Sequence, residues 1–265
     1  MRYNGTLRKM ESKLLNPVDY DLPIGDELVY MNNLIGKYII FQWLNKIICI
    51  ACGKNTNKSF AQGFCYPCFI SAPETSECIL RPELCQAQDG IARDMAWAKK
   101  HCLQDHFVYL AISSGVKVGV TRSGQIPTRW IDQGAWQTIK FAKTPNRYTA
   151  GLIEVTLKTH ISDRTQWQRM LKNQLIEGVE LGEKKQEMIT HLSSELQKFV
   201  STEEEVLEVT YPVNEYPEKV KSVGFDKLEE ISGRLWGIKG QYLMFDDGRV
   251  LNIRKHTGYL VELEV

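Results

Sequence analysis

Residues 106–122 read His-Phe-Val-Tyr-Leu-Ala-Ile-Ser-Ser-Gly-Val-Lys-Val-Gly-Val-Thr-Arg, and this stretch decides the fold. Two β-like runs, Phe107–Ile112 and Val116–Thr121, flank the short segment Ser113-Ser114-Gly115. Small polar residues and glycine between two such runs are typical of a tight turn. The stretch therefore predicts a hairpin of two antiparallel strands.

The residues that follow the hairpin predict a helix, a third strand and a second helix. Pro127 suits the first turn of a helix over residues 128–132, and Gly134 can end it. Trp136–Phe141 has the composition of a strand. A second helix is expected from Pro145 onward, with Glu154 among its apolar residues.

The order strand, strand, helix, strand, helix resembles the GIY-YIG endonuclease superfamily. The resemblance covers residues 106–158 and rests on Val108-Tyr109 in the first strand and Lys117-Val118-Gly119 in the second. It implies a three-stranded antiparallel sheet flanked by helices. The run 129–135, Arg-Trp-Ile-Asp-Gln-Gly-Ala, also resembles an uncharacterised prokaryotic zinc-containing family placed near these nucleases.

Carried over residue by residue, the resemblance implies four catalytic positions. Tyr109 matches the tyrosine of the first motif, Arg129 the arginine, and Glu154 the glutamate that binds a divalent metal. Lys117 stands where the second motif has a tyrosine, which leaves open the group that would activate the attacking water.

The chemistry of phosphodiester cleavage suits these residue types. Glu154 offers the oxygen ligand that Mg²⁺ or Mn²⁺ prefers, and Arg129 offers a fork for a phosphate oxygen. Tyr109 or Lys117 would handle the proton. The structural alternative is that Tyr109 is an ordinary sheet residue and that Arg129 and Glu154 form a salt bridge.

Two Cys-x-x-Cys pairs form the strongest motif in the chain. The pairs are Cys49 with Cys52 and Cys65 with Cys68, and twelve residues separate them. This spacing is typical of a four-thiolate structural zinc site. A redox pair would need only one motif, and paired disulfides would require an oxidising compartment.

The remaining cysteines predict a second zinc site. They are Cys78, Cys85 and Cys102, and His106 follows Cys102 at the spacing Cys-x₃-His. His101 competes with His106 for the fourth position. The alternative is that the three thiols are buried core residues.

The C-terminal part is rich in short β-like runs with Asp-Gly and other turn signals, which predicts a small β barrel. Segment 34–41 shows a faint likeness to segment 235–245, so these two β units are expected to pair. Across the chain, the candidate nucleic-acid contacts are Arg122, Trp130, Lys239, Arg254 and Lys255. Packing against other strands is the alternative for the aromatic residues.

Composition limits the classes of function. The 265 residues include 33 basic and 32 acidic side chains, 43% apolar residues and a net charge of +1. A protein coated with nucleic acid over its whole surface is therefore excluded, whereas a local basic patch is not. No apolar run reaches the length of a membrane span, and the N-terminus lacks the apolar core of a signal peptide, so a cytoplasmic protein without a membrane partner is expected.

Together these patterns predict an α+β protein with a GIY-YIG-like three-stranded sheet, zinc knuckles and a C-terminal small β barrel. The expected segments are 1–48 (β), 49–105 (cysteine-rich), 106–200 (nuclease-like with a helical extension) and 206–265 (barrel). The favoured hypothesis is a metal-dependent endonuclease acting on DNA or RNA. The alternatives are a non-catalytic zinc-containing nucleic-acid-binding protein that uses the same phosphate groove, and a small-molecule or protein-interaction role.

Overall fold

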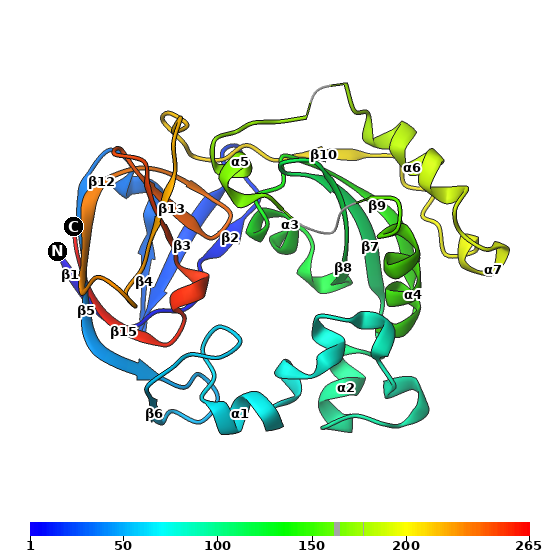
Figure 1. The fold of residues 1–265 in the computed structure, drawn as a ribbon, viewed down its shortest axis with the longest axis horizontal. Helices are drawn as coiled ribbons and strands as arrows, with labels where there is room; N and C mark the ends of the chain where they lie inside the picture. Colours follow the sequence, from blue (N-terminus) through cyan, green and yellow to red (C-terminus); the bar gives the residue numbers. More distant parts are fainter. Residues whose placement is uncertain (162–164, 177) are drawn as a thin grey trace. The chain divides into compact units, whose positions relative to one another are not determined.

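A computed structural model describes residues 1–161, 165–176 and 178–265, and these residues form an α+β protein. The chain divides into two compact units (Figure 1). Unit 1 comprises Met1–Ile70, Leu171–Asn173 and Val209–Val265, and unit 2 comprises Ser71–Met170 and Gln174–Glu208. The boundaries differ from the four expected segments, because the N-terminal and C-terminal β segments share one unit.

Unit 1 is built on an eight-stranded sheet. Its path is β1 (Arg2–Thr6), β15 (Tyr259–Glu264), β5 (Tyr38–Ile48), β12 (Glu230–Lys239), β13 (Tyr242–Phe245), β14 (Arg249–Asn252) and β11 (Lys221–Val223), and β6 (Asn55–Thr56) also pairs with β5. Alternate residues of β15 are buried, as expected for a strand with one face on a core. The long strand β5 is paired along both edges, by β12 and β15, and the register joins Tyr38–Gln42 to Glu230–Arg234, which lie just before the related segment 235–245.

The predicted C-terminal barrel is wrong. Strands β12 to β15 complete a sheet that β1 and β5 begin, and within the described residues this sheet does not close on itself. The C-terminal strands pair with both edges of β5 and so satisfy its backbone hydrogen-bonding groups within an open sheet. A smaller sheet of β2 (Glu11–Lys13), β3 (Asp19–Ile24) and β4 (Glu27–Tyr30), followed by the 3₁₀ turn η1 (Met31–Leu34), completes the strands of this unit.

Unit 2 contains an antiparallel sheet in the order β10 (Val206–Glu208), β9 (Gln137–Thr144), β7 (His106–Ile112) and β8 (Val116–Arg122). The predicted hairpin is confirmed as β7 and β8, in a register that pairs Tyr109 with Gly119. Every residue of the central strand β7 is buried. Both faces of the strand must therefore be covered.

Two helices cover these faces (Figure 1). Helix α4 (Arg147–Leu157) packs Ile153 and Leu157 into the core formed by the face of β7 that carries Val108 and Leu110. Helix α3 (Thr128–Asp132) packs Trp130 against the opposite face. The strands and helices predicted for residues 106–158 are thus present in the predicted order.

The cysteine-rich segment consists of short helical turns: α1 (Tyr66–Ser71), η2 (Pro73–Thr75), η3 (Glu77–Ile79), η4 (Pro82–Leu84), η5 (Ala87–Asp89) and α2 (Met95–His101). Residues 87–101 form two short helical elements, η5 and α2, and Gly90, at φ +78°, ends the first of them. Asp94 then caps α2 by accepting a hydrogen bond from the backbone N–H of Trp97 at 2.9 Å.

The remaining helical elements are short: η6 (Ser123–Gln125), α5 (Trp167–Leu171), α6 (Leu181–Ile189), α7 (Ser194–Gln197) and η7 (Arg254–His256). In the part of the chain that is described, none of the helices combines the length and the apolar character needed to cross a bilayer.

Candidate functional site

The first cysteine group gathers as predicted. The sulfur atoms of Cys49, Cys52, Cys65 and Cys68 all lie within 4.8 Å of one another. The Cys52 and Cys65 sulfurs are 3.8 Å apart. A tetrahedral zinc ion with Zn–S bonds of about 2.3 Å requires sulfur–sulfur distances of about 3.8 Å. The four thiols therefore fit zinc.

Backbone N–H groups support this site. Gly53, at φ +71°, makes the turn in which its N–H donates to the carbonyl oxygen of Cys49 at 2.9 Å. The backbone N–H of Cys65 donates to the Cys49 sulfur at 3.2 Å. Burial opposes ionisation of Cys49, but hydrogen bonds from the backbone of Cys65, Cys52 and Ala51 and from the Cys52 thiol outweigh it and lower its pKa to about 6. A thiolate at neutral pH is the form that binds zinc.

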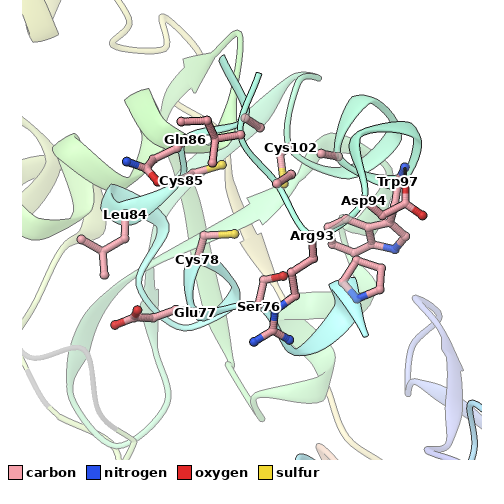
Figure 2. Close-up of a pocket in the computed structure, with 15 residues that line it drawn as sticks. Ser76, Glu77, Cys78, Leu84, Cys85, Gln86, Arg93, Asp94, Trp97 and Cys102 are labelled. Carbon is pink, nitrogen blue, oxygen red and sulfur yellow. Dashed lines mark hydrogen bonds between the residues drawn. The ribbon is translucent and has the colours of Figure 1, made fainter. Parts of the chain in front are cut away.

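The second cysteine group contains Cys78, Cys85 and Cys102, whose sulfurs also lie within 4.8 Å of one another. Figure 2 shows the three sulfurs pointing toward one another at a cavity of about 240 Å³. Hydrogen bonds from the other two thiols lower the pKa of Cys85, and the Cys78 pKa is raised in turn. One thiolate held by two thiols is ready to accept a metal ion.

The expected fourth ligand of this group is wrong. His106 is outside the group, and so is His101. The Nδ1 atom of His106 lies 2.7 Å from the carbonyl oxygen of Gln104. The Nδ1 atom of His101 lies 2.8 Å from the carbonyl oxygen of Trp97, and its ring stacks on the Trp97 indole at 4.0 Å. The Nδ1 atom of each imidazole is thus held by its own segment of backbone, while the Nε2 atom of His106 is buried without a hydrogen-bond partner.

Both histidines line a neighbouring cavity of about 330 Å³, which we call the arginine cavity. Its charged and polar lining includes Arg122, Arg129, Arg147, His101, His106 and Glu74. Burial lowers the pKa of Arg122, and the charge of Arg147 lowers it further. Burial also lowers the pKa of His106, to about 4. The cavity therefore concentrates positive charge that is incompletely balanced by its single lining carboxylate.

Arg147 joins the arginine cavity to the second cysteine group, and sequence reasoning missed it. Its guanidinium donates to the carbonyl oxygens of Cys78 at 3.2 Å and of His101 at 3.1 Å. Its backbone N–H donates to the carbonyl oxygen of Cys102 at 2.8 Å. The available signal was weak: Arg147 is the first residue of α4, where a cation opposes the helix dipole and must have another reason to be present.

Two of the predicted catalytic residues, Arg129 and Glu154, act electrostatically on a third, Tyr109. Tyr109 is completely buried, and its ring meets Trp130 edge-on at 6.0 Å. Burial raises the pKa of Tyr109; Arg129 lowers it and Glu154 raises it. The structure thus places Arg129 and Glu154 near Tyr109. Lys117 is buried and its Nζ donates to Thr165 Oγ1 at 2.7 Å.

The predicted catalytic set does not share one cavity. Arg129 lines the arginine cavity, whereas Tyr109, Lys117 and Glu154 do not. The Glu154 carboxylate is 9% exposed and lies 3.3 Å from the ammonium of Lys158. An ammonium in that position competes with a divalent cation for the carboxylate. Among the described residues, Glu154 belongs to no group of three or more metal ligands, so a divalent cation here would need water or a bound phosphate to complete its coordination.

The five predicted nucleic-acid contacts separate into three classes. Arg122 lines the arginine cavity. Arg254 donates to Gln62 Oε1 at 2.6 Å, and Lys255 pairs with Asp226 at 3.3 Å.

Trp130 and Lys239 were wrong predictions, because their exposed fractions are 4% and 0%. The Lys239 ammonium donates to Asn173 Oδ1 at 2.9 Å and lies over the rings of Tyr211 and Tyr216, at 5.3 and 5.0 Å from their centres. Cation–π contact and one hydrogen bond thus hold Lys239 in the interior.

Comparison with known proteins identifies a family but no characterised relative. No curated protein and no solved structure matches the chain. One family model, described as "Protein of unknown function (DUF2797)", matches residues 36–261. This match runs through both cysteine groups and every residue that lines the arginine cavity. The chain therefore belongs to the DUF2797 family.

Proposed function

We propose that this protein binds the phosphate backbone of DNA or RNA through the arginine cavity. The observation that carries the proposal is the convergence of Arg122, Arg129 and Arg147 on one cavity of unit 2. Guanidinium groups present paired N–H donors that match two phosphate oxygens, and they keep their charge when partly buried. Like charges repel, so an arrangement of this kind is stabilised by a bound anion.

The strand order of unit 2 supports the likeness to the GIY-YIG superfamily. The sequence of elements β7, β8, α3, β9 and α4 follows the order of that superfamily, and β7 lies between β8 and β9. Fold likeness alone does not carry a function. The position of Arg129 on the first helix, with its side chain at the cavity, adds a specific residue to that likeness.

Zinc in the second cysteine group would hold the segment beside the cavity. Cys78 and Cys102 accept hydrogen bonds from Arg147 through their carbonyl oxygens. An ion bound by their sulfurs would restrain the same residues from the other side. The proposed role of zinc is therefore structural, and it fixes the direction of one of the three guanidinium groups.

The test measures the affinity of labelled oligonucleotides as a function of salt. The affinities of the wild type and of Arg122→Gln should each be measured for single-stranded DNA, duplex DNA and RNA of one sequence. Loss of one phosphate contact should weaken binding by roughly tenfold to a hundredfold and reduce the salt slope by about 0.9. Arg129→Gln should act in the same direction.

Arg234→Gln is the matched control, because Arg234 is an exposed arginine of unit 1 that pairs with Asp246. Its affinity and salt slope should equal those of the wild type. The proposal fails if Arg122→Gln and Arg234→Gln bind alike, or if the wild type binds none of the three nucleic acids.

Cleavage is a second candidate, and the closeness of Tyr109, Arg129 and Glu154 favours it. In this candidate a bound strand would draw Glu154 away from Lys158 and toward Mg²⁺ or Mn²⁺. Wild type and Glu154→Gln should then bind oligonucleotides equally, while only the wild type cuts them when either metal is supplied. Strands that bind and stay whole under both metals would leave phosphate binding as the function.

A further inference from the structure

We propose that Cys78, Cys85 and Cys102 hold a zinc ion whose fourth ligand is exchangeable and is a low-molecular-weight thiol. The proposal rests on the contrast between two metal-binding groups in one chain. The first group supplies four sulfurs and the second supplies three. The second group also borders a cavity of about 240 Å³ (Figure 2).

Coordination chemistry distinguishes these two arrangements. Zinc sites that serve only structure are closed by four protein ligands, whereas sites with three protein ligands keep the fourth position for water or another small molecule. Among the described residues, no histidine, aspartate or glutamate joins the three sulfurs within 4.8 Å. His101 and His106, the nearest sequence candidates, lie outside this group, and their Nδ1 atoms contact backbone carbonyl oxygens.

The cavity supplies room and access for a small ligand. Cys78 is half-buried, whereas Cys85 and Cys102 are buried, so the cavity is reached past Cys78. Trp97 and Arg93 line the cavity together with the sulfurs (Figure 2). The Arg93 guanidinium, which donates to the carbonyl oxygen of Ala72 at 2.8 Å and to Thr75 Oγ1 at 3.0 Å, brings positive charge to the cavity.

The donor set favours sulfur in the fourth position. Three thiolates more than neutralise the doubly charged ion and make it a weak activator of water, so hydrolytic chemistry is disfavoured, while soft sulfur donors remain good ligands. A fourth thiolate adds a negative charge, which the nearby guanidinium of Arg147 offsets; the charge of Arg147 acts on all three cysteines. In this exchange the incoming thiol releases its proton to solvent, its sulfur bonds to the ion, and the bound water leaves.

The test uses the full chain loaded anaerobically with Co²⁺, whose charge-transfer absorption reports sulfur ligands. Two ions per chain are expected. L-Cysteine should raise the absorption of the second ion by roughly one third, because four thiolates replace three. L-Serine, which has the same charges but no thiol, should change nothing. Cys85→Ser should abolish the response, and Cys52→Ser should retain it.

A second measurement needs no variant and guards against misfolding of the cysteine variants. X-ray absorption of the zinc-loaded wild type should give about 3.5 sulfur ligands per ion without cysteine and about 4 with it. The inference is overturned if only one ion binds, if cysteine strips the second ion, if cysteine and serine act alike, or if the sulfur count does not change. None of these readouts involves nucleic acid, so the proposal of phosphate binding stands or falls separately.

Discussion

The hydroxyl of Tyr109 lies over Gly119, its partner across the β7–β8 hairpin. A Cβ atom on residue 119 would come within 2.5 Å of that hydroxyl oxygen. Glycine at this position therefore lets a large, fully buried ring lie flat across the neighbouring strand. The tyrosine and glycine that the sequence motif singles out are one packing unit.

Gly119→Ala should consequently destabilise the protein. The added methyl group displaces a buried ring that also packs on Trp130, and overpacking of this kind costs about 1–3 kcal/mol. Thermal or urea denaturation measures the loss. Gly115→Ala in the turn of the same hairpin is the control, because an added Cβ there meets nothing within 4 Å. Equal stability of the two variants would contradict the packing argument.

Gly151→Ala should weaken the second cysteine group. Gly151 lies on α4 against the backbone of Pro82 and Glu83, with no space for a Cβ atom. An alanine there pushes away the turn that ends at Cys85, so the three sulfurs separate. We expect a metal content of one ion per chain in place of two, measured by elemental analysis. Gly182→Ala on α6, where a Cβ meets nothing within 4 Å, should keep both ions. If Gly151→Ala still binds two ions per chain, the displaced turn keeps its three sulfurs together and the prediction is wrong.

His106 should make the protein less stable in acid. Burial lowers its pKa to about 4 in the folded protein, below the 6.5 of a free histidine. Between these two values the unfolded chain binds the proton and the folded protein does not, so stability falls as pH falls from 6.5 toward 4. The full effect is on the order of 3 kcal/mol. Denaturation of the wild type and of His106→Gln across this range isolates the imidazole. Parallel profiles would rule out His106 as the cause.

Lys239→Met should remove a change in stability at alkaline pH. Burial lowers the pKa of Lys239 to about 8, below the 10.5 of a free lysine. Between pH 8 and 10.5 the unfolded chain still binds the Lys239 proton, whereas the folded protein has released it. The stability of the wild type therefore rises with pH in this range. Methionine has a similar shape and no charge, so at neutral pH the variant should lie within about 1.5 kcal/mol of the wild type. Denaturation at pH 7, 8.5 and 10 tests this prediction. If the stability of Lys239→Met also rises with pH, another group is the cause of the rise.

The elements of unit 2 could be predicted because each rests on local pattern. A continuous apolar run in 107–112 and an alternating run in 116–121, with a turn between them, indicate a hairpin whatever surrounds it. The two Cys-x-x-Cys pairs likewise carry their geometry in their spacing, since each short pair brings two sulfurs together. The barrel prediction failed because the same β-like runs suit either a closed barrel or an open sheet. Only the pairing of β5 with both β12 and β15 decides between them.

The sequence by itself determined the hairpin, the helices around Arg129 and Glu154, and the four-sulfur group, because these follow from periodicity and short-range spacing. The tertiary structure alone decided where the charges lie. It buried Lys239, placed His106 in the lining of the arginine cavity and outside the cysteine group, and brought Arg147 beside Arg122. The physical reason is that the cost of burying a charge depends on every group packed around it, and those groups come from distant parts of the chain.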